Sequence, residues 1–497
     1  MTAGDAHGDK MPGMFGCLAG KAYFWDVNGE EFAAGVLSAM GVPPTDEQRA
    51  AAGVVSRFVW EGGGRSVMML CGSAGTGKTT LAGAVVRVLR GCGCRVSLLA
   101  PTGRAAKVLS SYAGAPAYTI HRRIYRQKTL DGGMPSFSLA PNMQSDTLFI
   151  VDEASLISNG GGEYGSGRLL DDLMAYVYGG ARCRLMLVGD TAQLPPVGYS
   201  VSPALSAGVL ESYGTTVYTA SLDSVVRQGR ASGILYNATA VRRTIAGGTV
   251  TALPQVLFRG YADVTRVSGE DLVEALSSSY ASVGKDETIV VTRSNRQARA
   301  YNDGIRRAVL GCEDEINGGD MVMVVKNKYM ATEEDSAAPP FIANGDRARV
   351  TRVRGMHEQH GFRFADITLS FPDYDGYELT APAILDTLHT AAPALTTEQS
   401  AALYRSVAAD YADIPHKAER MEAVRSDRYY GALQIKFAYA VTCHKAQGGQ
   451  WAHVYVDQGY ITEEMVTSDY ARWLYTAFTR ATERLFLINW PDRQTKE

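Results

Sequence analysis

The apolar positions of the chain follow two different periods. VMMLC, LFIV and the LMLV of RLMLV are continuously apolar runs, which are typical of strands buried on both faces of a parallel sheet. TLAGAVVRVLRG follows the first run, has apolar residues at helical spacing and closes at Gly91. This alternation of strands and helices from Gly72 to Gly198 predicts an α/β fold, a parallel sheet with helices on both faces.

The second half of the chain predicts further elements of both kinds. TIVVTRSNRQARAYNDGIRRAVLG predicts a strand followed by an amphipathic helix, and LQIKFAYAV predicts one strand. Short strands with turns are expected in GGDMVMVVKNKYM and FIANGDRARVTRV. Thr396-Thr397-Glu398-Gln399 is a capping sequence for a helix that we expect to run to about Tyr411.

A segment between Ile124 and Asp146 predicts a β-hairpin. Two short polar–apolar runs flank Asp131-Gly132-Gly133, which is a turn signal. A disordered loop is the alternative.

Composition narrows the class of protein. The length of 497 residues, with 46% hydrophobic and 20% charged residues, predicts several compact units with large cores. Seven cysteines without zinc-ligand spacing favour free thiols, and the absence of a long apolar run or signal sequence predicts a cytosolic protein without membrane contact. The net charge of −3 means that any nucleic-acid binding must depend on positive charge gathered locally.

The strongest local signal is a phosphate loop, G-x-x-x-x-G-K-T, between a predicted strand and a predicted helix. Its glycines let backbone N–H groups surround phosphates at a helix N-terminus, and a chance glycine-rich turn is the alternative. We expect Lys78 to contact the β- and γ-phosphates of ATP and Thr79 to hold Mg²⁺. The expected nucleotide-binding residues are Gly72, Ser73, Ala74, Gly75, Thr76, Gly77, Lys78, Thr79 and Thr80.

Two later strand ends carry candidate catalytic groups. Asp152 would ligate Mg²⁺, and Glu153 would orient and deprotonate the attacking water. Gln193 follows the third apolar run, where its amide would sense the γ-phosphate; a structural turn at Pro195-Pro196 is the alternative. To this point the sequence predicts a P-loop ATPase.

TCHKAQGGQW places Cys443 directly before His444. Two functional interpretations of this pair are a thiol–imidazole nucleophile and half of a metal site. Neighbouring side chains of a strand point to opposite faces, so adjacency alone does not bring the two groups to one reacting atom. These residues therefore leave the question open.

Seven segments, in order, resemble the motifs of superfamily 1 helicases, most closely the RecD-like and Dda-like superfamily 1B group. The resemblance extends from Thr45 to Ile488, and nothing between Phe371 and Tyr430 matches a motif. The segments are TDEQRAA, LLAPTGRAAKVLS, TIHRRIY, GDTAQLPPVG, SVVRQ, TCHKAQGGQW and LYTAFTRATERLFLI.

The resemblance implies roles for further residues. Gln48 would contact adenine, Gln447 and Gly448 would approach the nucleotide, and Cys443 would be a buried small side chain. Arg227 and Arg480 would act as arginine fingers from the second core, and a surface ion pair is the alternative for either. Residues expected to contact DNA are Thr102, Arg104, Lys107, His121, Arg122, Thr442 and His444, with Phe137 on the hairpin as a duplex-splitting pin. Arg293, Asn295 and Asn302 resemble a further motif, and Arg104 and Lys107 are alternatively solvated charges.

The implied architecture is two RecA-like P-loop cores with a β-hairpin insertion and an SH3-like insertion. We expect an N-terminal extension at 1–40 and a first core at 41–220 that carries the hairpin at 124–146. A second core at 221–312 and 433–497 would enclose an SH3-like insertion with helical elaboration at 313–432. The implied function is an ATP-dependent, 5′→3′ DNA helicase, a monomeric motor on single-stranded and tailed duplex DNA. An RNA-directed motor and an ATP-switch subunit of a nuclease complex are the alternatives.

Overall fold

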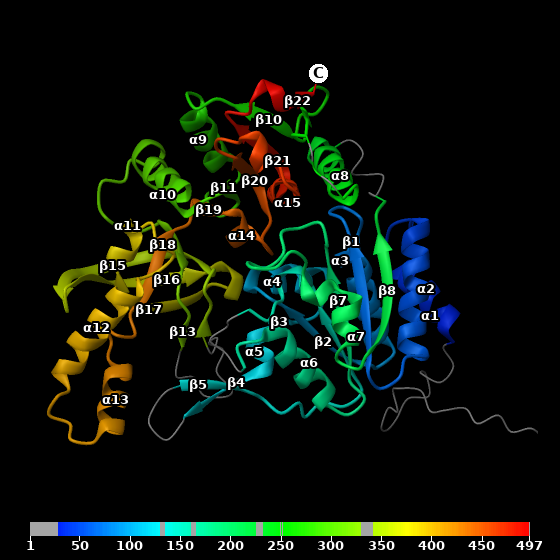
Figure 1. Ribbon diagram of the computed structural model, residues 1–497, viewed down its shortest axis with the longest axis horizontal. Coiled ribbons are helices and arrows are strands. Elements are labelled where there is room, and N and C mark those ends of the chain that lie inside the picture. The colour runs from blue at the N-terminus through cyan, green and yellow to red at the C-terminus, as the bar shows by residue number, and fades with distance from the viewer. Residues whose placement is uncertain are drawn as a thin grey trace, which may run out of the picture.

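The protein is described from a computed structural model, in which two parallel sheets and a barrel make up most of the fold (Figure 1). In Figure 1 the second sheet lies above the first, and the barrel lies to the left. The described residues are 28–129, 135–160, 166–224, 232–248, 250, 252–329 and 341–496, with side chains left out at 127–129, 135–137, 329 and 341.

The first sheet is parallel, with the strand order β3-β2-β6-β7-β1-β8. Its strands are β1 (Ser66–Gly72), β2 (Arg95–Ala100), β3 (Ala117–Thr119), β6 (Thr147–Val151), β7 (Arg184–Gly189) and β8 (Thr216–Leu222). Its helices are α1 (Gly29–Ala39), α2 (Asp46–Trp60), α3 (Lys78–Gly91), α4 (Gly103–Ala113), α5 (Ile120–Ile124), α6 (Leu169–Gly179) and α7 (Ala207–Glu211).

Helices cover both faces of this sheet, as the apolar runs predicted. Met68 and Leu70 of β1 pack with Phe58 of α2, whereas Val67 packs with Leu173 of α6. Alternate side chains of one strand therefore enter two separate cores. The carboxyl ends of β1, β6 and β7 lie together at the edge that carries the phosphate loop.

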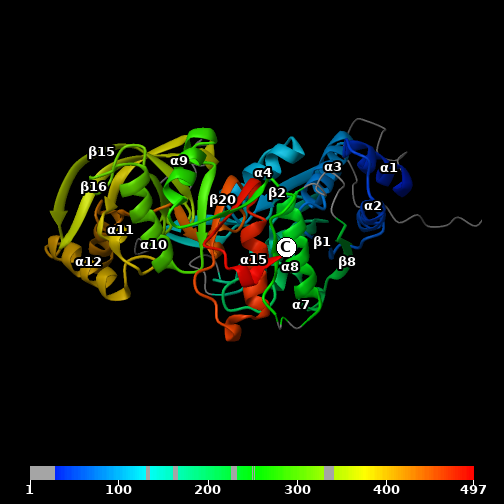
Figure 2. The same cartoon turned by 90° about the horizontal axis from the view of Figure 1, so that it is seen from above.

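The second sheet is also parallel, with the order β10-β21-β20-β11-β19. Its strands are β10 (Val264–Val267), β11 (Thr288–Thr292), β19 (Ala440–Thr442), β20 (Trp451–Asp457) and β21 (Ala481–Ile488). Helices around it are α8 (Gly233–Ala246), α9 (Leu272–Ser282), α10 (Asn295–Gly304), α14 (Cys443–Ala446) and α15 (Ser468–Phe478). Figure 2 shows α8 and α15 side by side between the two sheets. Among the described residues, no helix is long and apolar enough to cross a bilayer.

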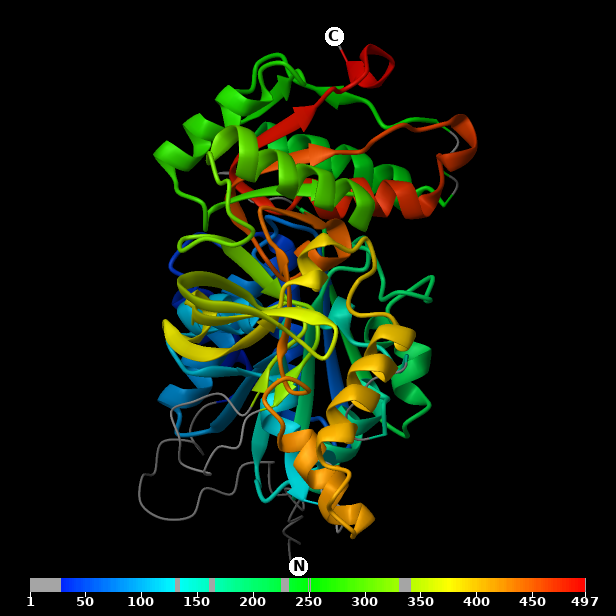
Figure 3. The ribbon, with the colours of Figure 1, turned by 90° about the vertical axis from the view of Figure 1, so that its left-hand side faces the viewer.

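A closed barrel is inserted into the second core. Its strand order is β12-β15-β16-β17-β18, and Figure 3 shows it in front of the first sheet and below the second. The barrel strands are β12 (Met321–Val324), β15 (Arg347–Gln359), β16 (Phe362–Phe371), β17 (Tyr377–Ile384) and β18 (Leu433–Phe437). Smaller elements attached to it are β13 (Lys328–Tyr329), β14 (Phe341–Ile342), α11 (Asp386–His389), α12 (Thr397–Asp410) and α13 (Lys417–Ser426).

The segment expected as one strand, LQIKFAYAV, is two strands in two different sheets. β18 pairs antiparallel with β12 of the barrel, and β19 pairs parallel with β11 of the second sheet. The chain crosses between the sheets at Ala438 and Tyr439. Assigning residues from 433 onward to the second core was therefore wrong for Leu433–Phe437. No glycine or proline interrupts the run, so its apolar pattern did not reveal the crossing.

Two other predicted elements are present. The helix that follows the capping sequence is α12, where the Thr396 hydroxyl accepts from the Gln399 N–H and Tyr411 is the C-cap. The hairpin consists of β4 (Tyr125–Thr129) paired antiparallel with β5 (Pro135–Leu139).

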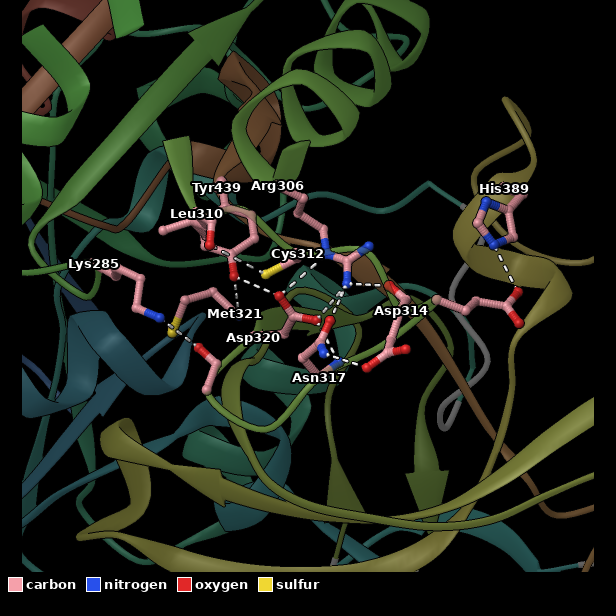
Figure 4. Close-up of polar contacts among 12 residues, drawn as sticks. Lys285, Arg306, Leu310, Cys312, Asp314, Asn317, Asp320, Met321, His389 and Tyr439 are labelled. Atoms are coloured by element: carbon pink, nitrogen blue, oxygen red, sulfur yellow. Dashed lines mark hydrogen bonds and ion pairs between the residues drawn. The ribbon is translucent and has the colours of Figure 1, made fainter. Parts of the chain in front are cut away.

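A buried polar network joins the barrel to the second core (Figure 4). Arg306 lies just after α10, and Asp320 lies just before β12. The two side chains form an ion pair at 3.0 Å. Asp320 also accepts from the Tyr439 hydroxyl at 2.7 Å and from the Asn317 N–H at 2.7 Å. A buried carboxylate must be paired to be tolerated, and the partners of Asp320 include residues on both sides of the junction between the barrel and the second core.

Candidate nucleotide site and nucleic-acid groove

The phosphate loop connects β1 to α3 and is shaped by its own side chains. Gly75 and Gly77 have φ of 74° and 82°, the left-handed region that favours glycine. The Thr76 hydroxyl and the Lys78 ammonium each donate to the Ser73 carbonyl at 2.8 Å. Lys78 begins α3, so its charge and the helix N-terminus face the same space, which suits an anion. The other predicted residues are Gly72 at the end of β1, Ala74 within the loop, and Thr79 and Thr80 in the first turn of α3.

Gln48 of α2 holds the phosphate loop by a hydrogen bond. Its Oε1 accepts from the Thr45 N–H at 2.9 Å, and its Nε2 donates to the Thr76 carbonyl at 2.9 Å. The residue is 1% exposed. Both ends of the amide are used within the protein, and contact with adenine stays a prediction.

Thr79 and Asp152 meet where a magnesium ion was predicted. The Thr79 hydroxyl donates to Asp152 Oδ2 at 3.0 Å, and Asp152 Oδ1 accepts from the Glu153 N–H at 2.8 Å. Burial raises the pKa of Asp152, while the Glu153 N–H and Lys78 act in the opposite direction. A hydroxyl and a carboxylate are the oxygen ligands that Mg²⁺ takes in phosphate-loop sites, so this pair fits the ion. The described residues contain no group of three or more His, Cys, Asp or Glu side chains that could hold a metal.

Glu153 lies between charges from both cores. Burial raises its pKa, and the charges of Arg480 and Lys78 act in the opposite direction. Its backbone has φ of 52°, which is uncommon for a residue with a side chain. A carboxylate with a raised pKa is better suited to accept a proton from water.

Arg480 is 2% exposed and approaches this site from the second core. Its Nε donates to the Thr476 carbonyl at 3.0 Å and its Nη1 to the Gly449 carbonyl at 3.0 Å. The guanidinium is therefore held by backbone carbonyls, and the surface ion pair considered as its alternative is excluded.

One face of α15 contacts the first core, which sequence patterns did not indicate. The Tyr475 hydroxyl accepts from the Ala74 N–H of the phosphate loop at 2.9 Å and donates to Asp190. The Thr476 hydroxyl accepts from the Leu194 N–H at 2.8 Å. Tyr475 and Thr476 are adjacent, and Thr479 and Arg480 follow them by four residues each, so the available signal was the helical spacing of polar groups within LYTAFTR.

Gln193 is buried in the first core, and Gln447 of the second core contacts the residue that follows it. Gln193 is 6% exposed, and its Oε1 has no hydrogen-bond partner among the described residues. Gln447 Nε2 donates to the Leu194 carbonyl at 2.6 Å. Gly448 has φ of 73°, and a Cβ there would lie 2.8 Å from the Thr102 hydroxyl. The motif that contains Gln447 therefore packs closely on the first core.

The predicted DNA-contacting residues divide between a groove and a core–core contact. Lys107 and Arg122 line a groove of about 740 Å³ between α4 and the barrel turn that contains Tyr374. Lys107 Nζ donates to the Pro372 carbonyl at 2.7 Å across this groove, and Arg122 lies over the Tyr118 ring at 5.1 Å. Both cations therefore line this groove, and their contact with DNA stays a prediction.

Thr102 and Arg104 lie at the contact between the cores. Thr102 caps α4, accepting from the Ala105 N–H. Arg104 pairs with Glu287 at 3.3 Å, donates to the Gln450 carbonyl and lies over the Trp451 ring at 4.6 Å. Its solvated-charge alternative is excluded, and a role in DNA binding stays a prediction.

The remaining predicted contacts are distributed around the second core and α5. Burial lowers the pKa of His121 to about 4, so its ring is neutral near pH 7. Thr442 lines a 30 Å³ cavity with Lys436 and Lys445, and His444 is exposed on α14. Arg227 lies outside the described residues, and so does the side chain of Phe137.

Cys443 and His444 do not form a reactive pair. Cys443 is 1% exposed, its Sγ donates to the Trp473 carbonyl at 3.6 Å, and burial raises its pKa to about 12. A buried thiol with a raised pKa is a poor nucleophile. The prediction of a buried small side chain is confirmed.

Comparison with known families gives matches to both halves of this site. Residues 45–258 match the AAA domain, and residues 437–488 match the UvrD-like helicase C-terminal domain. The resemblance to RecD-like, superfamily 1B helicases is confirmed. A curated relative, the ATP-dependent RecD2 DNA helicase of Deinococcus radiodurans, is 26% identical over 433 residues, which cover 85% of this chain and 47% of the relative. The chain thus spans about half the length of that RecD-like relative.

Among solved structures, Pif1 helicases are similar. Bacteroides Pif1 bound to ssDNA has 15% identity and a TM-score of 0.45, over 91% of this chain and 94% of that one. Pif1 from Candida albicans has 17% identity and a TM-score of 0.38, over 92% and 97%.

Proposed function

We propose that the protein is an ATP-dependent DNA helicase that moves 5′→3′ along a single strand. The observation that carries this proposal is that the Arg480 charge of the second core acts on the Glu153 carboxylate of the first, beside the hydrogen-bonded Thr79–Asp152 pair. Hydrolysis at such a site depends on how the two cores are placed, and this dependence converts ATP turnover into movement along a strand.

Each group of the proposed site has a separate task. Lys78 binds the β- and γ-phosphates, while Thr79 and Asp152 hold Mg²⁺, which when bound neutralises charge on those phosphates. Glu153 orients the attacking water and accepts its proton. Arg480, together with Arg227, stabilises the charge on the phosphoryl group during transfer, a contribution of roughly 10³–10⁵ in rate for arginine fingers. Gln193 and Gln447 respond to the γ-phosphate.

The proposed DNA track runs through the groove of Lys107 and Arg122 and continues past Thr442 and Lys445. Cations and hydroxyls suit backbone phosphates, which carry no sequence information, so the motor accepts many sequences. The β4–β5 hairpin is the proposed pin that separates a tailed duplex. We assign the first sheet to a first RecA-like core, the second sheet to a second RecA-like core and the barrel to an SH3-like insertion, and the proposed motor acts as a monomer.

ATPase assays with and without single-stranded DNA test this function. We expect strong stimulation by the strand, because strand binding aligns the cores that bring Arg480 to the phosphate. We also expect the apparent affinity for the strand to fall steeply between 50 and 200 mM salt, about a hundredfold or more for five or more phosphate contacts, through counterion release. Stimulation by neither DNA nor RNA, or affinity that is independent of salt, contradicts the proposal.

A further inference from the structure

A single hydroxyl connects three parts of the nucleotide site. Tyr475 on α15 accepts a hydrogen bond from the Ala74 N–H of the phosphate loop at 2.9 Å. The same hydroxyl donates to a carboxylate oxygen of Asp190, at the end of β7. The donor and the acceptor both belong to the first core, whereas Tyr475 belongs to the second.

Burial shields both hydrogen bonds of the Tyr475 hydroxyl from water. Its side chain is 1% exposed, and Asp190 is also 1% exposed. Burial and the neighbouring carboxylate raise the pKa of Tyr475 well above its usual value, so the hydroxyl stays protonated. A neutral hydroxyl donates and accepts at once, and a buried carboxylate without this donor would be left partly unpaired.

Asp190 continues the connection toward Gln193. Its Oδ1 accepts from the Ala192 N–H at 3.0 Å, and its carbonyl accepts from the Gln193 N–H at 3.3 Å. On the other side, the chain reaches Arg480 five residues after Tyr475, and the charge of Arg480 acts against the rise in the pKa of Glu153. Tyr475 of α15 therefore contacts the phosphate loop and the residue that leads to Gln193, and Arg480 follows two residues after the helix ends.

We propose that Tyr475 is a positioning residue that transmits the state of the phosphate loop to the Gln193 loop and to Arg480 across the contact between the two cores. This inference rests on the proposed ATPase function. When the second core moves on a bound strand, α15 carries the Tyr475 hydroxyl with it. The Ala74 amide and the Asp190 carboxylate, which are both hydrogen-bonded to this hydroxyl, are then displaced together. The residue thus acts through its neighbours and makes no contact with the transferring phosphoryl group.

Tyr475→Phe tests the role because it removes the hydroxyl and keeps the ring. Tyr470→Phe is the matched control: it lies on the same helix, is 2% exposed, and its hydroxyl donates at 2.6 Å to Gln458, away from the contact between the two cores. Both variants are measured for kcat and KM of ATP hydrolysis at saturating single-stranded DNA, and for thermal unfolding. We expect Tyr475→Phe to lose about tenfold in DNA-stimulated kcat with KM for ATP changed less than about twofold, a loss of transition-state interactions alone. Tyr470→Phe should match the parent in kcat.

The outcomes separate this inference from the proposed function. A parent protein without ATPase activity overturns the proposed function. A parent that hydrolyses ATP, with equal stimulated kcat in Tyr475→Phe, overturns the inference alone, and so does an equal loss in Tyr470→Phe. If Tyr475→Phe does not fold, Asp190→Asn replaces it, since the amide keeps an acceptor oxygen and removes the charge. Loss of stimulated kcat then supports the inference, and parent-like kcat overturns it.

Discussion

Lys78 and Glu153 separate nucleotide binding from turnover in the proposed site. Lys78→Ala removes the charge at the start of α3 and should reduce both ATP affinity and hydrolysis to background. Glu153→Gln keeps the size and polarity of the side chain but cannot accept a proton, so ATP should bind while turnover stops. Fluorescent-nucleotide binding combined with multiple-turnover hydrolysis measures both. Near-parental hydrolysis in either variant refutes these assignments.

Asp346 introduces a pH dependence of stability into the barrel. Burial raises its pKa to about 7, although its carboxylate accepts from the Tyr374 hydroxyl at 2.6 Å. Because the unfolded chain releases this proton near pH 4, the contribution is fully present below about pH 4 and is lost as pH rises through about 7. The loss amounts to at most about 4 kcal/mol by the same linkage.

Asp346→Asn removes this titration and keeps an acceptor oxygen. Urea unfolding at pH 5 and pH 8 should show the parent losing stability relative to the variant as pH rises. Asp375→Asn, an exposed carboxylate in the neighbouring turn, is the control and should track the parent. A variant whose stability falls with pH as steeply as the parent contradicts the assignment.

At the scale of elements, the hairpin separates unwinding from translocation. β4 and β5 lie outside the phosphate loop and the strand ends that carry Asp152 and Gln193. Leu139 and Ala140 pack on the core of the first sheet, so a shortened hairpin must retain them. Replacing residues 128–137 with a short Gly/Ser turn should leave DNA-stimulated ATPase within about twofold of the parent and strongly reduce strand displacement, because duplex separation costs a few kcal/mol per step.

Single substitutions refine this prediction. Phe137→Ala should reduce strand displacement less than the shortened hairpin does, and Ser136→Ala in the same strand serves as its control. If the shortened variant unwinds tailed duplexes at the parental rate, the fork is separated elsewhere in the protein.

The elements that the sequence predicted well are those with local causes. The phosphate loop follows from glycine conformations, α12 from its capping residues, and the hairpin from its turn signal. The crossing at Ala438 between barrel and second sheet has no local cause, since both neighbours accept the same apolar residues. Tyr475 was likewise missed, because its role depends on Ala74 and Asp190, which only the folded chain brings to it.

Arg104 shows a related difficulty at the contact between elements. Its motif predicted a surface cation for DNA, yet Glu287 and Trp451 of the second core surround it. Sequence gives the residue type and its helix but not the partner from a distant segment. By contrast, Lys107 and Arg122 lie in the groove, where the resemblance implied DNA contacts.

At the scale of the whole molecule, positive side chains gather at particular sites although the net charge is negative. The net charge is −3, yet Lys107 and Arg122 line one wall of the groove, while Arg299, Lys436 and Lys445 surround the cavity beside Thr442. Asp373 and Asp375 on the barrel wall face the first pair. A strand with its phosphates toward the cations and its bases toward the barrel satisfies this arrangement, which is consistent with backbone recognition.

Strand displacement on duplexes with a single tail tests the central claim most directly. Identical duplexes carrying a 5′ DNA tail, a 3′ DNA tail or a 5′ RNA tail are incubated with the protein, ATP and Mg²⁺. Lys78→Ala serves as the inactive control. The account predicts rapid displacement of the 5′ DNA-tailed duplex alone. Displacement from the 3′ tail, preference for the RNA tail, or no displacement by a protein that hydrolyses ATP would contradict it.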